Sequence, residues 1–498
     1  MSDNVTQLIQ GMSDYRPFTA MVIGDFMLDE QVSGAAERLS PDAPVPVLHL
    51  DPSRSTCSPG GASHVARSLR AMEAQVSCFG ITGDDPQREQ LLGLLETAGC
   101  STDGILVDAS RPTTLKQTLV GLAQHRHPQK MFRVDRESSS PISKEIADRL
   151  LGRIREAMES VDVVCLEDYN KGVCTEYLCS QVIECARQHR RPILVDPAAI
   201  SSFTKYTGAT CITPNRSEAE LAGGLDSCLD STSEHAKSLA TQLLDSLELD
   251  AAVLTLDRDG AMVAFGKDVE HVRTQARNVY DVTGAGDTVL AALAAGRANE
   301  FSWPASVMLA NVAAGLQVES FGATPIPLAS VRARLLELVS DMHGKTRTMP
   351  DLVLELASHR EAGRRIVLTN GCFDVIHAGH VAYLKEAKKQ GDILVVGVNS
   401  DEQVRILKGE DRPVFDQRER TEILEELHCI DYVIVFDEPT AEQLIRQIRP
   451  SIYVKGGDYK PEEITEHDLV RELQIELKVL AHRPGLGSTA VIDRLRQQ

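Results

Sequence analysis

Short apolar runs rich in β-branched residues recur along the chain and alternate with segments of helical period. Runs such as "TAMVIGDFML" and "VDVVCLEDY" are separated by amphipathic patterns such as "SKEIADRLLGRIREAM" and "EYLCSQVIECARQH". Strands that alternate with helices at this pace predict a mostly parallel sheet covered on both faces. The pattern continues over roughly residues 15–340.

The alternation stops at the polar segment "HGKTRTMP" and then resumes in a shorter stretch with runs such as "DILVVGVNS". A polar segment with Gly and Pro and no apolar period is typical of a linker. We therefore predict an α/β protein with a first domain over residues 1–340, a linker and leading helix over 341–360, and a second, smaller Rossmann-like domain over 361–498.

Composition narrows the class of protein. The 498 residues are 42% hydrophobic and 25% charged, which is typical of a globular chain, and the formal charge is −20. That charge disfavours nonspecific binding to nucleic acid or to a membrane surface. We expect no secretory signal, because the first residues show no basic segment followed by an apolar run. The sequence also has no apolar run of about 20 residues and no CxxC pair among its eleven cysteines. We expect a cytoplasmic protein without membrane or nucleic-acid partners.

The stretch "DVTGAGDTVLAAL" combines tiny residues and a carboxylate at the start of an apolar helical pattern. Gly284, Ala285 and Gly286 would let backbone N–H groups approach an anion, and the helix dipole would favour negative charge there. Asp287 in the first turn could then accept a proton from an attacking hydroxyl. The alternative is an ordinary helix cap after a glycine turn.

Two upstream motifs add candidates for the same site. In "CITPNRSEAE", Asn215 and Glu218 follow a predicted strand, where they could orient a magnesium–nucleotide complex, with Glu218 as the metal ligand. In "SPGGASHVARSL", Gly60 and Gly61 open a helix and would allow close approach of a sugar. Each motif taken alone is equally consistent with a capped turn.

The motifs "GDFMLD", "LEDYNKG", "VDP", "TPNRSE" and "DVTGAGD" occur in the order found in ribokinase-like (PfkB) sugar kinases. The first domain resembles that family, which implies a ribokinase-like fold with a small β lid. The segment "ERLSPDAPVPVL" is similar to one found in its heptose-7-phosphate kinases.

This resemblance implies a role for each matching residue. Asp287 would be the catalytic base, and Gly284, Ala285 and Gly286 the anion hole. The residues implied for the ATP site are Asn215, Arg216, Ser217, Glu218, Thr255, Gly260 and Asn311. The residues implied for the sugar site are Asp29, Gly60, Gly61, His64, Lys116, Arg133 and Lys171. His64 departs from the family, which usually has Asn at this position.

The second domain contains "GCFDVIHAGHVAYLKEAKK", in which His377 and His380 are three residues apart. On a helix start they would share one face, and Gly379 between them leaves room for a phosphate. Imidazoles and N-terminal amides could neutralise charge at a triphosphate. The alternatives are a metal pair and ordinary histidines at a helix start. A metal pair is disfavoured because the sequence shows no third ligand cluster with zinc-like spacing, and an HExxH motif would require a spacing of four.

The pattern GxFDxxHxGH is the hallmark of cytidylyltransferase-like nucleotidyltransferases, which the second domain resembles. The resemblance implies His377, His380 and Lys455 as catalytic residues. It also implies a nucleotide site made by Gly371, Phe373, Asp374, Gly379, Asn399, Asp401, Lys408, Ser488 and Thr489. Ala490 departs from the family, whose members commonly carry a further hydroxyl residue there.

The order of the two halves is similar to that in the bifunctional enzymes of ADP-heptose synthesis. It implies phosphorylation of D-glycero-β-D-manno-heptose 7-phosphate at O1, followed by adenylyl transfer from ATP to heptose 1-phosphate. Mg²⁺ with ATP and a homodimer or larger homo-oligomer are further expectations. The alternatives are a fusion that acts on another phosphorylated sugar with CTP, and a regulatory protein whose sites have decayed.

Overall fold

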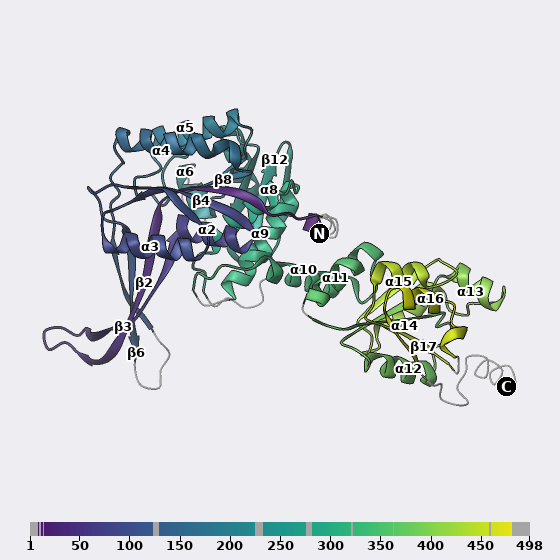
Figure 1. Cartoon of the computed structure of the whole chain (residues 1–498). Coiled ribbons are helices and arrows are strands. Elements are labelled where there is room, and N and C mark those ends of the chain that lie inside the picture. Colours follow the sequence, from purple (N-terminus) through teal and green to yellow (C-terminus); the bar gives the residue numbers. More distant parts are fainter. Residues whose placement is uncertain are drawn as a thin grey trace. The chain divides into compact units, whose positions relative to one another are not determined.

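The chain forms two compact units, Met1–Val331 (unit 1) and Arg332–Gln498 (unit 2), in a computed structural model. Both units are α/β, so the predicted fold class is confirmed (Figure 1). The structure describes residues 8, 11, 12, 14–122, 129–224, 233–274, 281–319, 322–361, 363–457 and 460–480.

The central sheet of unit 1 is mostly parallel, as predicted. Its described strands are β1 (Phe18–Gly24), β4 (Ala74–Thr82), β5 (Ser101–Val107), β8 (Val163–Glu167), β9 (Ile193–Asp196), β10 (Cys211–Ile212), β11 (Ala251–Thr255), β12 (Ala261–Phe265) and β13 (Asp268–Val272). They run in the order β13-β12-β11-β10-β9-β8-β1-β4-β5, and only the β11–β12 and β12–β13 pairings among them are antiparallel. The carboxyl ends of β8 and β9 therefore lie side by side.

Helices cover both faces of this sheet. The described helices are α2 (Ala62–Ala71), α3 (Pro86–Thr97), α4 (Lys144–Ala157), α5 (Glu176–Gln188), α6 (Arg216–Ala222), α7 (Ser233–Ser246), α8 (Ala285–Ala298), α9 (Trp303–Val318) and α10 (Leu328–His343), the last of which crosses into unit 2. Helices α4, α5 and α7 share one apolar core with the sheet. Helices α2, α8 and α9 pack together, and α8 and α9 are apolar nearly all round, as buried helices are.

A smaller sheet forms a lid on unit 1. It is made of β2 (Phe26–Leu39), β3 (Pro46–Gly61), β6 (Thr114–Leu122) and β7 (Gln129–Arg136), in the order β3-β2-β6-β7. Figure 1 shows β2, β3 and β6 extending away from the layered body of unit 1. The near end of β2 is buried and its far end is exposed, so only the near end packs against the body of unit 1.

Unit 2 is a smaller parallel sheet with helices on both sides. Its described elements are α11 (Met349–Glu361), β14 (Ile366–Gly371), α12 (Ala378–Lys388), β15 (Ile393–Asn399), α13 (Asp401–Lys408), α14 (Gln417–Glu425), β16 (Tyr432–Phe436), α15 (Glu442–Ile448), β17 (Ile452–Gly456), α16 (His467–Glu472) and β18 (Glu476–Leu480). The strand order is β16-β15-β14-β17-β18. The fully buried run of β15 occupies an inner position, as a continuous apolar strand should.

The polar segment predicted as a linker is bound to unit 2. Thr346 forms a bridge with Val433 of β16, and the side chain of Arg347 is buried against Glu355 of α11, with 2.6 Å between Nε and Oε1. Hydropathy alone cannot reveal a segment that is anchored by one buried ion pair. No described helix combines the length and apolar character that crossing a bilayer requires.

The buried ion pair generates a stability prediction. In Arg347→Met, Glu355 would keep its place in the core without its cation, and we expect unit 2 to lose about 3 kcal/mol of unfolding free energy. The side chains of Arg347 and Glu355 are only 1% and 2% exposed, so water cannot replace the lost partner. Hydrogen exchange of β14 and β15 amides in increasing urea measures the loss.

The matched control is Arg446→Met, which breaks an ion pair with Glu472 whose side chains are 50% and 64% exposed. An exposed pair contributes about 0–1 kcal/mol, so this variant should exchange almost as the native protein does. Equal losses in the two variants would contradict a structural role for the buried pair.

Candidate active sites

The first turn of α8 is built around a glycine in the left-handed region. Gly284 has φ +79° and precedes α8 as its N-cap residue, with no side-chain cap of its own. A Cβ added at Gly284 would lie 2.9 Å from Nε2 of His64. Only glycine therefore suits both the backbone angle and the close packing of α2. The helix start predicted as an anion hole therefore has no side chain at position 284.

Asp287 lies in that first turn and is 4% exposed. The hydroxyl of Tyr169 donates a hydrogen bond to its Oδ1 at 2.9 Å. Burial raises the pKa of Asp287 to about 6, while the Tyr169 hydrogen bond and the Lys116 charge pull it back down. A carboxylate with a pKa near the working pH is suited to accept and release a proton.

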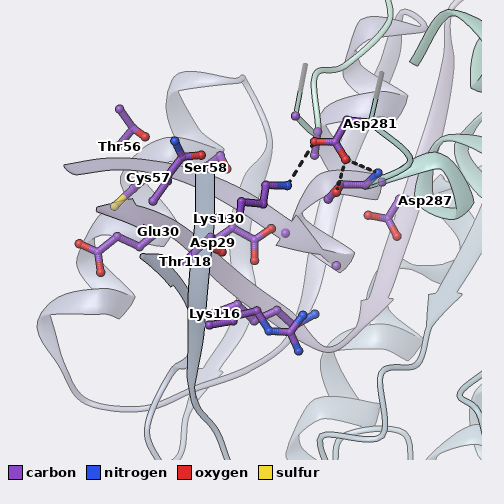
Figure 2. A pocket seen from close by; sticks show the side chains of 18 of the residues that line it. Asp29, Glu30, Thr56, Cys57, Ser58, Lys116, Thr118, Lys130, Asp281 and Asp287 are labelled. Atoms are coloured by element: carbon purple, nitrogen blue, oxygen red, sulfur yellow. Dashed lines mark hydrogen bonds and ion pairs between the residues drawn. The ribbon is translucent and has the colours of Figure 1, made fainter. Parts of the chain in front are cut away.

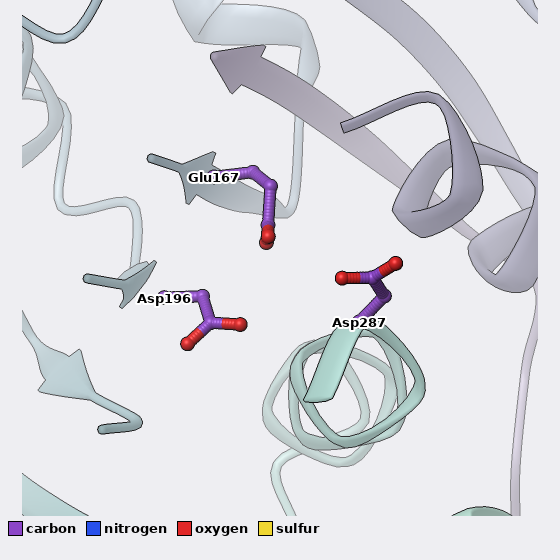
Figure 3. Close-up of side chains that lie close together, drawn as sticks. All are labelled: Glu167, Asp196 and Asp287. Carbon is purple, nitrogen blue, oxygen red and sulfur yellow. The ribbon is translucent and has the colours of Figure 1, made fainter. Parts of the chain in front are cut away.

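Two further carboxylates face Asp287, and they were missed by the sequence analysis. Glu167 ends β8 and Asp196 ends β9, and one oxygen from each of the three carboxylates lies within 4.8 Å of the others (Figure 3). Burial, reinforced by the neighbouring carboxylates, raises the pKa of both Glu167 and Asp196 well above the usual value. Oε2 of Glu167 is buried without a hydrogen-bond partner. Three oxygen donors at one point fit a hard divalent cation.

The sequence held a signal for this cluster. Glu167 and Asp196 stand in "LEDYNKG" and "VDP", each directly after an apolar run. Carboxyl ends of adjacent parallel strands meet at one edge of a sheet. Sequence patterns alone do not give the strand order, so the adjacency of β8 and β9 was not predictable.

Four of the residues predicted for the ATP site lie just after β10, the strand beside β9. Asn215 and Glu218 form a reciprocal capping box at the start of α6, with Arg216 and Ser217 in its first turn. Thr255 at the end of β11 bridges to Asn215. The charge of Glu218 helps to raise the pKa of Asp196, which places Glu218 near the carboxylate cluster. A role for Glu218 as a metal ligand remains a prediction.

The other two residues predicted for the ATP site have structural contacts. Gly260 adopts φ +91° in the turn before β12. Asn311 of α9 is buried and donates from Nδ2 to the carbonyl oxygen of Val272 at 2.8 Å. Their roles toward ATP also remain predictions.

A cavity of about 500 Å³ lies between the lid and the start of α8 (Figure 2). Five of the residues predicted for the sugar site line it, and so do Gly284 and Asp287. These five are Asp29 of β2, Gly60 and Gly61 of β3, Lys116 of β6 and Arg133 of β7. A Cβ at Gly60 would lie 2.4 Å from Oδ2 of Asp29, so the glycine is needed for packing. The structure thus brings the predicted base and most of the predicted sugar residues to one cavity.

Charge in this cavity is mixed. Burial raises the pKa of Asp29, and the charges of Lys116 and Arg133 oppose that rise. Lys130, which the sequence analysis missed, pairs with Asp281 across the cavity with 3.4 Å between Nζ and Oδ2. Cations beside carboxylates can hold a phosphorylated sugar by both its phosphate and its hydroxyls.

Two residues predicted for the sugar site do not line the cavity. Lys171 pairs with Glu137, with 2.6 Å between Nζ and Oε1. His64 is fully buried behind Gly284, and burial lowers its pKa to about 4, so its ring is neutral. Both ring nitrogens of His64 lack a hydrogen-bond partner. His64 therefore shapes the wall behind the helix start.

In unit 2, the two histidines of the predicted site lie together at the start of α12. Nδ1 of His377 accepts a hydrogen bond from the backbone N–H of Gly379 at 3.1 Å, so His377 caps the helix. The ring centroids of His377 and His380 are 4.0 Å apart, and the ring of Phe373 lies 5.6 Å from that of His380. Gly371 ends β14 just before this loop.

Lys455 stands on β17, the neighbour of β14. Its Nζ lies 3.6 Å from Oε1 of Glu466, a residue that the sequence analysis missed. Burial lowers the pKa of Lys455, and the charge of Glu466 opposes that shift. Lys455 is therefore a mostly buried cation kept in place by one carboxylate.

Two predicted carboxylates of unit 2 bind arginines of their own unit. Asp374 pairs with Arg412 at 2.8 Å, and Asp401 pairs with the fully buried Arg420 at 2.7 Å. These arginines were not predicted. Asn399 is buried at the end of β15.

The remaining predictions for unit 2 concern phosphate contacts. Lys408 is the exposed last residue of α13, where its charge is available to a ligand. Ser488 and Thr489 lie outside the described residues.

Each unit matches a known protein family. Residues 19–329 match the family described as pfkB family carbohydrate kinase, and residues 368–494 match the cytidylyltransferase-like family. The chain is 40% identical over 482 residues to "Bifunctional protein HldE" of Geobacter metallireducens, covering 96% of each chain. It is 39% identical over 489 residues to the protein of the same name from Wolinella succinogenes, covering 97% of this chain and 99% of the relative.

Solved structures support the fold of unit 1. Ribokinase of Arabidopsis thaliana with ribose and ATP matches with a TM-score of 0.51 and 17% identity, over 64% of this chain and 99% of that one. Phosphofructokinase-2 of Escherichia coli matches with a TM-score of 0.52 and 14% identity, over 65% and 99%. The resemblances stated from the sequence motifs are thus confirmed, and the chain belongs to the bifunctional HldE family, in which a pfkB-type carbohydrate kinase precedes a cytidylyltransferase-like domain.

Proposed function

We propose that unit 1 transfers phosphate from ATP to O1 of D-glycero-β-D-manno-heptose 7-phosphate, and that unit 2 joins the resulting heptose 1-phosphate to AMP from a second ATP. A separate phosphatase must remove the 7-phosphate between the two steps. The observation that carries this proposal is the buried Asp287 at an uncapped helix start, in a cavity lined with lid cations. Family membership supports the pairing of kinase and nucleotidyltransferase.

In the kinase step, Asp287 accepts the proton of the attacking sugar hydroxyl. The N–H groups at the start of α8 face the negative charge that develops on the transferred phosphoryl group. Lys116 and Arg133 hold the sugar phosphate, and Asp29 orients a sugar hydroxyl. Phosphoryl transfer needs little covalent chemistry from the protein, so placement and charge account for most of the catalysis.

We propose Mg²⁺ with ATP as the cofactor of unit 1. Glu167 and Asp196 offer oxygen donors of the kind that this ion prefers, beside Asp287, and Glu218 lies nearby. When bound, the ion would neutralise charge on the ATP phosphates.

In the second step, a phosphate oxygen of heptose 1-phosphate attacks the α-phosphorus of ATP and pyrophosphate leaves. His377, His380 and Lys455 supply the positive or hydrogen-bonding groups that stabilise the added charge. The start of α12 points its N–H groups toward the same place. Both units thus perform related electrostatic work on phosphorus.

The lid suggests how copies of the chain assemble. Large apolar side chains are exposed on it, including Leu39 at 65% and Phe132 at 56%. Exposed apolar side chains that gather on one element are typical of an interaction site. We therefore propose a homodimer or larger homo-oligomer that uses the lid. We place the enzyme in the cytoplasm, where ATP is available and where the described cysteines, all of them free, would stay reduced.

The direct test is a reconstitution. The purified protein is incubated with heptose 7-phosphate, ATP, Mg²⁺ and a heptose bisphosphate phosphatase, and we expect ADP-heptose by mass spectrometry. A product formed from CTP but not from ATP would support a cytidylyl transferase. Binding of ATP without turnover would support a decayed regulatory protein.

The two active sites should be separable by mutation. We expect Asp287→Asn to lower kinase turnover by at least about 100-fold, because the proton acceptor is lost, and to leave adenylyl transfer intact. His377→Ala should have the reverse effect. Separate assays for ADP and pyrophosphate release measure the two reactions.

Two exposed residues provide the controls for these variants. Asp245→Asn on α7 and His428→Ala in unit 2 should retain both activities. If either active-site variant lost both activities while remaining folded, the two sites would not be independent.

The partner of Lys455 generates a pH prediction. Glu466→Gln removes the charge that opposes the burial-driven drop in the pKa of Lys455, so the ammonium should lose its proton at lower pH. We expect the alkaline limb of adenylyl transfer to move to lower pH, while the kinase profile stays unchanged. Pyrophosphate release followed from neutral to alkaline pH measures the shift.

Glutamine can still accept the hydrogen bond that Glu466 takes from the N–H of Ala441 at 3.1 Å. Glu472→Gln removes a carboxylate from the same helix, α16, at an exposed site and is the matched control. An unmoved alkaline limb in Glu466→Gln would show that Lys455 does not set it.

A further inference from the structure

The side chain of Tyr169 makes two contacts inside the kinase cavity. It follows β8, two residues after Glu167, and lines the cavity beside Asp287. Its hydroxyl donates to Oδ1 of Asp287 at 2.9 Å. Nζ of Lys116 lies 4.4 Å from the centroid of its ring. One side chain therefore contacts the proposed base through oxygen and a proposed sugar-binding cation through its ring.

The backbone around Tyr169 is held in place. Its N–H donates to Oδ2 of Asp25 at 2.8 Å, and the N–H of Lys171 donates to the same oxygen at 3.0 Å. The N–H of Asn170 donates to Oδ1 of Asp168 at 2.7 Å, and Asn170 adopts φ +56°. Asp25 is itself buried at the junction of β1 and β2. Tyr169 thus projects from an anchored turn, which is what a side chain that orients another group requires.

The hydrogen bond has a specific consequence for Asp287. A carboxylate on a helix can rotate about its last torsion, which has a broad preference. One oxygen of Glu167 and one of Asp196 lie within 4.8 Å of an Asp287 oxygen, so without a fixed donor the Asp287 carboxylate could rotate toward either of these groups. The hydroxyl of Tyr169 fixes Oδ1 and thereby fixes the direction in which Oδ2 points.

The ring has a different consequence, for Lys116. A cation over an aromatic face is attracted to the ring, and the attraction is stronger when water is excluded. The ring would hold the ammonium of Lys116 at the cavity wall, where the sugar phosphate is proposed to bind.

We propose that Tyr169 is a positioning residue of the kinase reaction, whose hydroxyl aims the carboxylate of Asp287 at the acceptor hydroxyl and whose ring holds Lys116 against the sugar phosphate. This inference rests on the proposed function of unit 1. The two contacts predict two separable kinetic effects.

Two substitutions separate the contacts. Tyr169→Phe keeps the ring and removes the hydroxyl, and we expect kcat of the kinase to fall about 10- to 100-fold with the KM for the sugar phosphate nearly unchanged. Tyr169→Leu removes both contacts, and we expect the same loss in kcat together with a rise of about 5-fold or more in that KM. Adenylyl transfer by unit 2 in the same preparation reports the concentration of folded enzyme.

The matched control is Tyr177→Phe. Tyr177 also donates its hydroxyl to an aspartate, Oδ1 of Asp148 at 2.6 Å, but at an exposed site on α5. This variant should keep native kcat and KM. If Tyr169→Leu does not fold, the Tyr169→Phe variant still decides the role of the hydroxyl.

The inference is overturned if Tyr169→Phe has native kcat, or if it raises the KM as much as Tyr169→Leu does. Failure of the proposed function gives a different result. Full kinase turnover in Asp287→Asn would show that Asp287 is not the base. An unchanged KM for the sugar phosphate in Lys116→Ala would show that Lys116 does not bind it. Either result would reject the corresponding half of the inference as well.

Discussion

The close packing of α2 against the first turn of α8 is the constraint on which the kinase site depends. His64 lies so near Gly284 that only a residue without a side chain fits there, in a left-handed backbone conformation. This contact fixes where α8 begins, and the start of α8 fixes where Asp287 points. Because Gly284 and Gly286 carry no side chains, the amides at this helix start can meet a phosphate. The sugar cavity under the lid then opens onto the same turn.

Much of the architecture could be predicted from the sequence, because parallel strands and their helices leave a periodic apolar pattern. The order of the strands leaves no such pattern, so the meeting of Glu167 and Asp196 could not be predicted. The hydrogen bond between Tyr169 and Asp287 joins residues 118 positions apart. Strand β7 is exposed along nearly its whole length, so its residues carry no burial period either. The family resemblance implied a small β lid but did not place these residues in it.

Some residues of the candidate sites could likewise be predicted from the sequence, and others could not. Gly284 and Asp287 could be predicted from the sequence, because a glycine turn and a carboxylate at a helix start form a local pattern. Asp374 and Asp401 were predicted for the nucleotide site, yet their arginine partners became visible only in the folded chain. Glu466 was missed because it approaches Lys455 from another element. A residue that acts through a distant partner has no signal in a short motif.

We propose that the phosphoryl group is transferred at the start of α8. A crystal structure with a non-hydrolysable ATP analogue and the sugar phosphate bound together tests this claim most directly. We expect the terminal phosphate within hydrogen-bond distance of the backbone nitrogens of Gly284–Gly286, and the acceptor hydroxyl against Asp287. A triphosphate bound elsewhere in unit 1, or an acceptor hydroxyl against a different carboxylate, would contradict it.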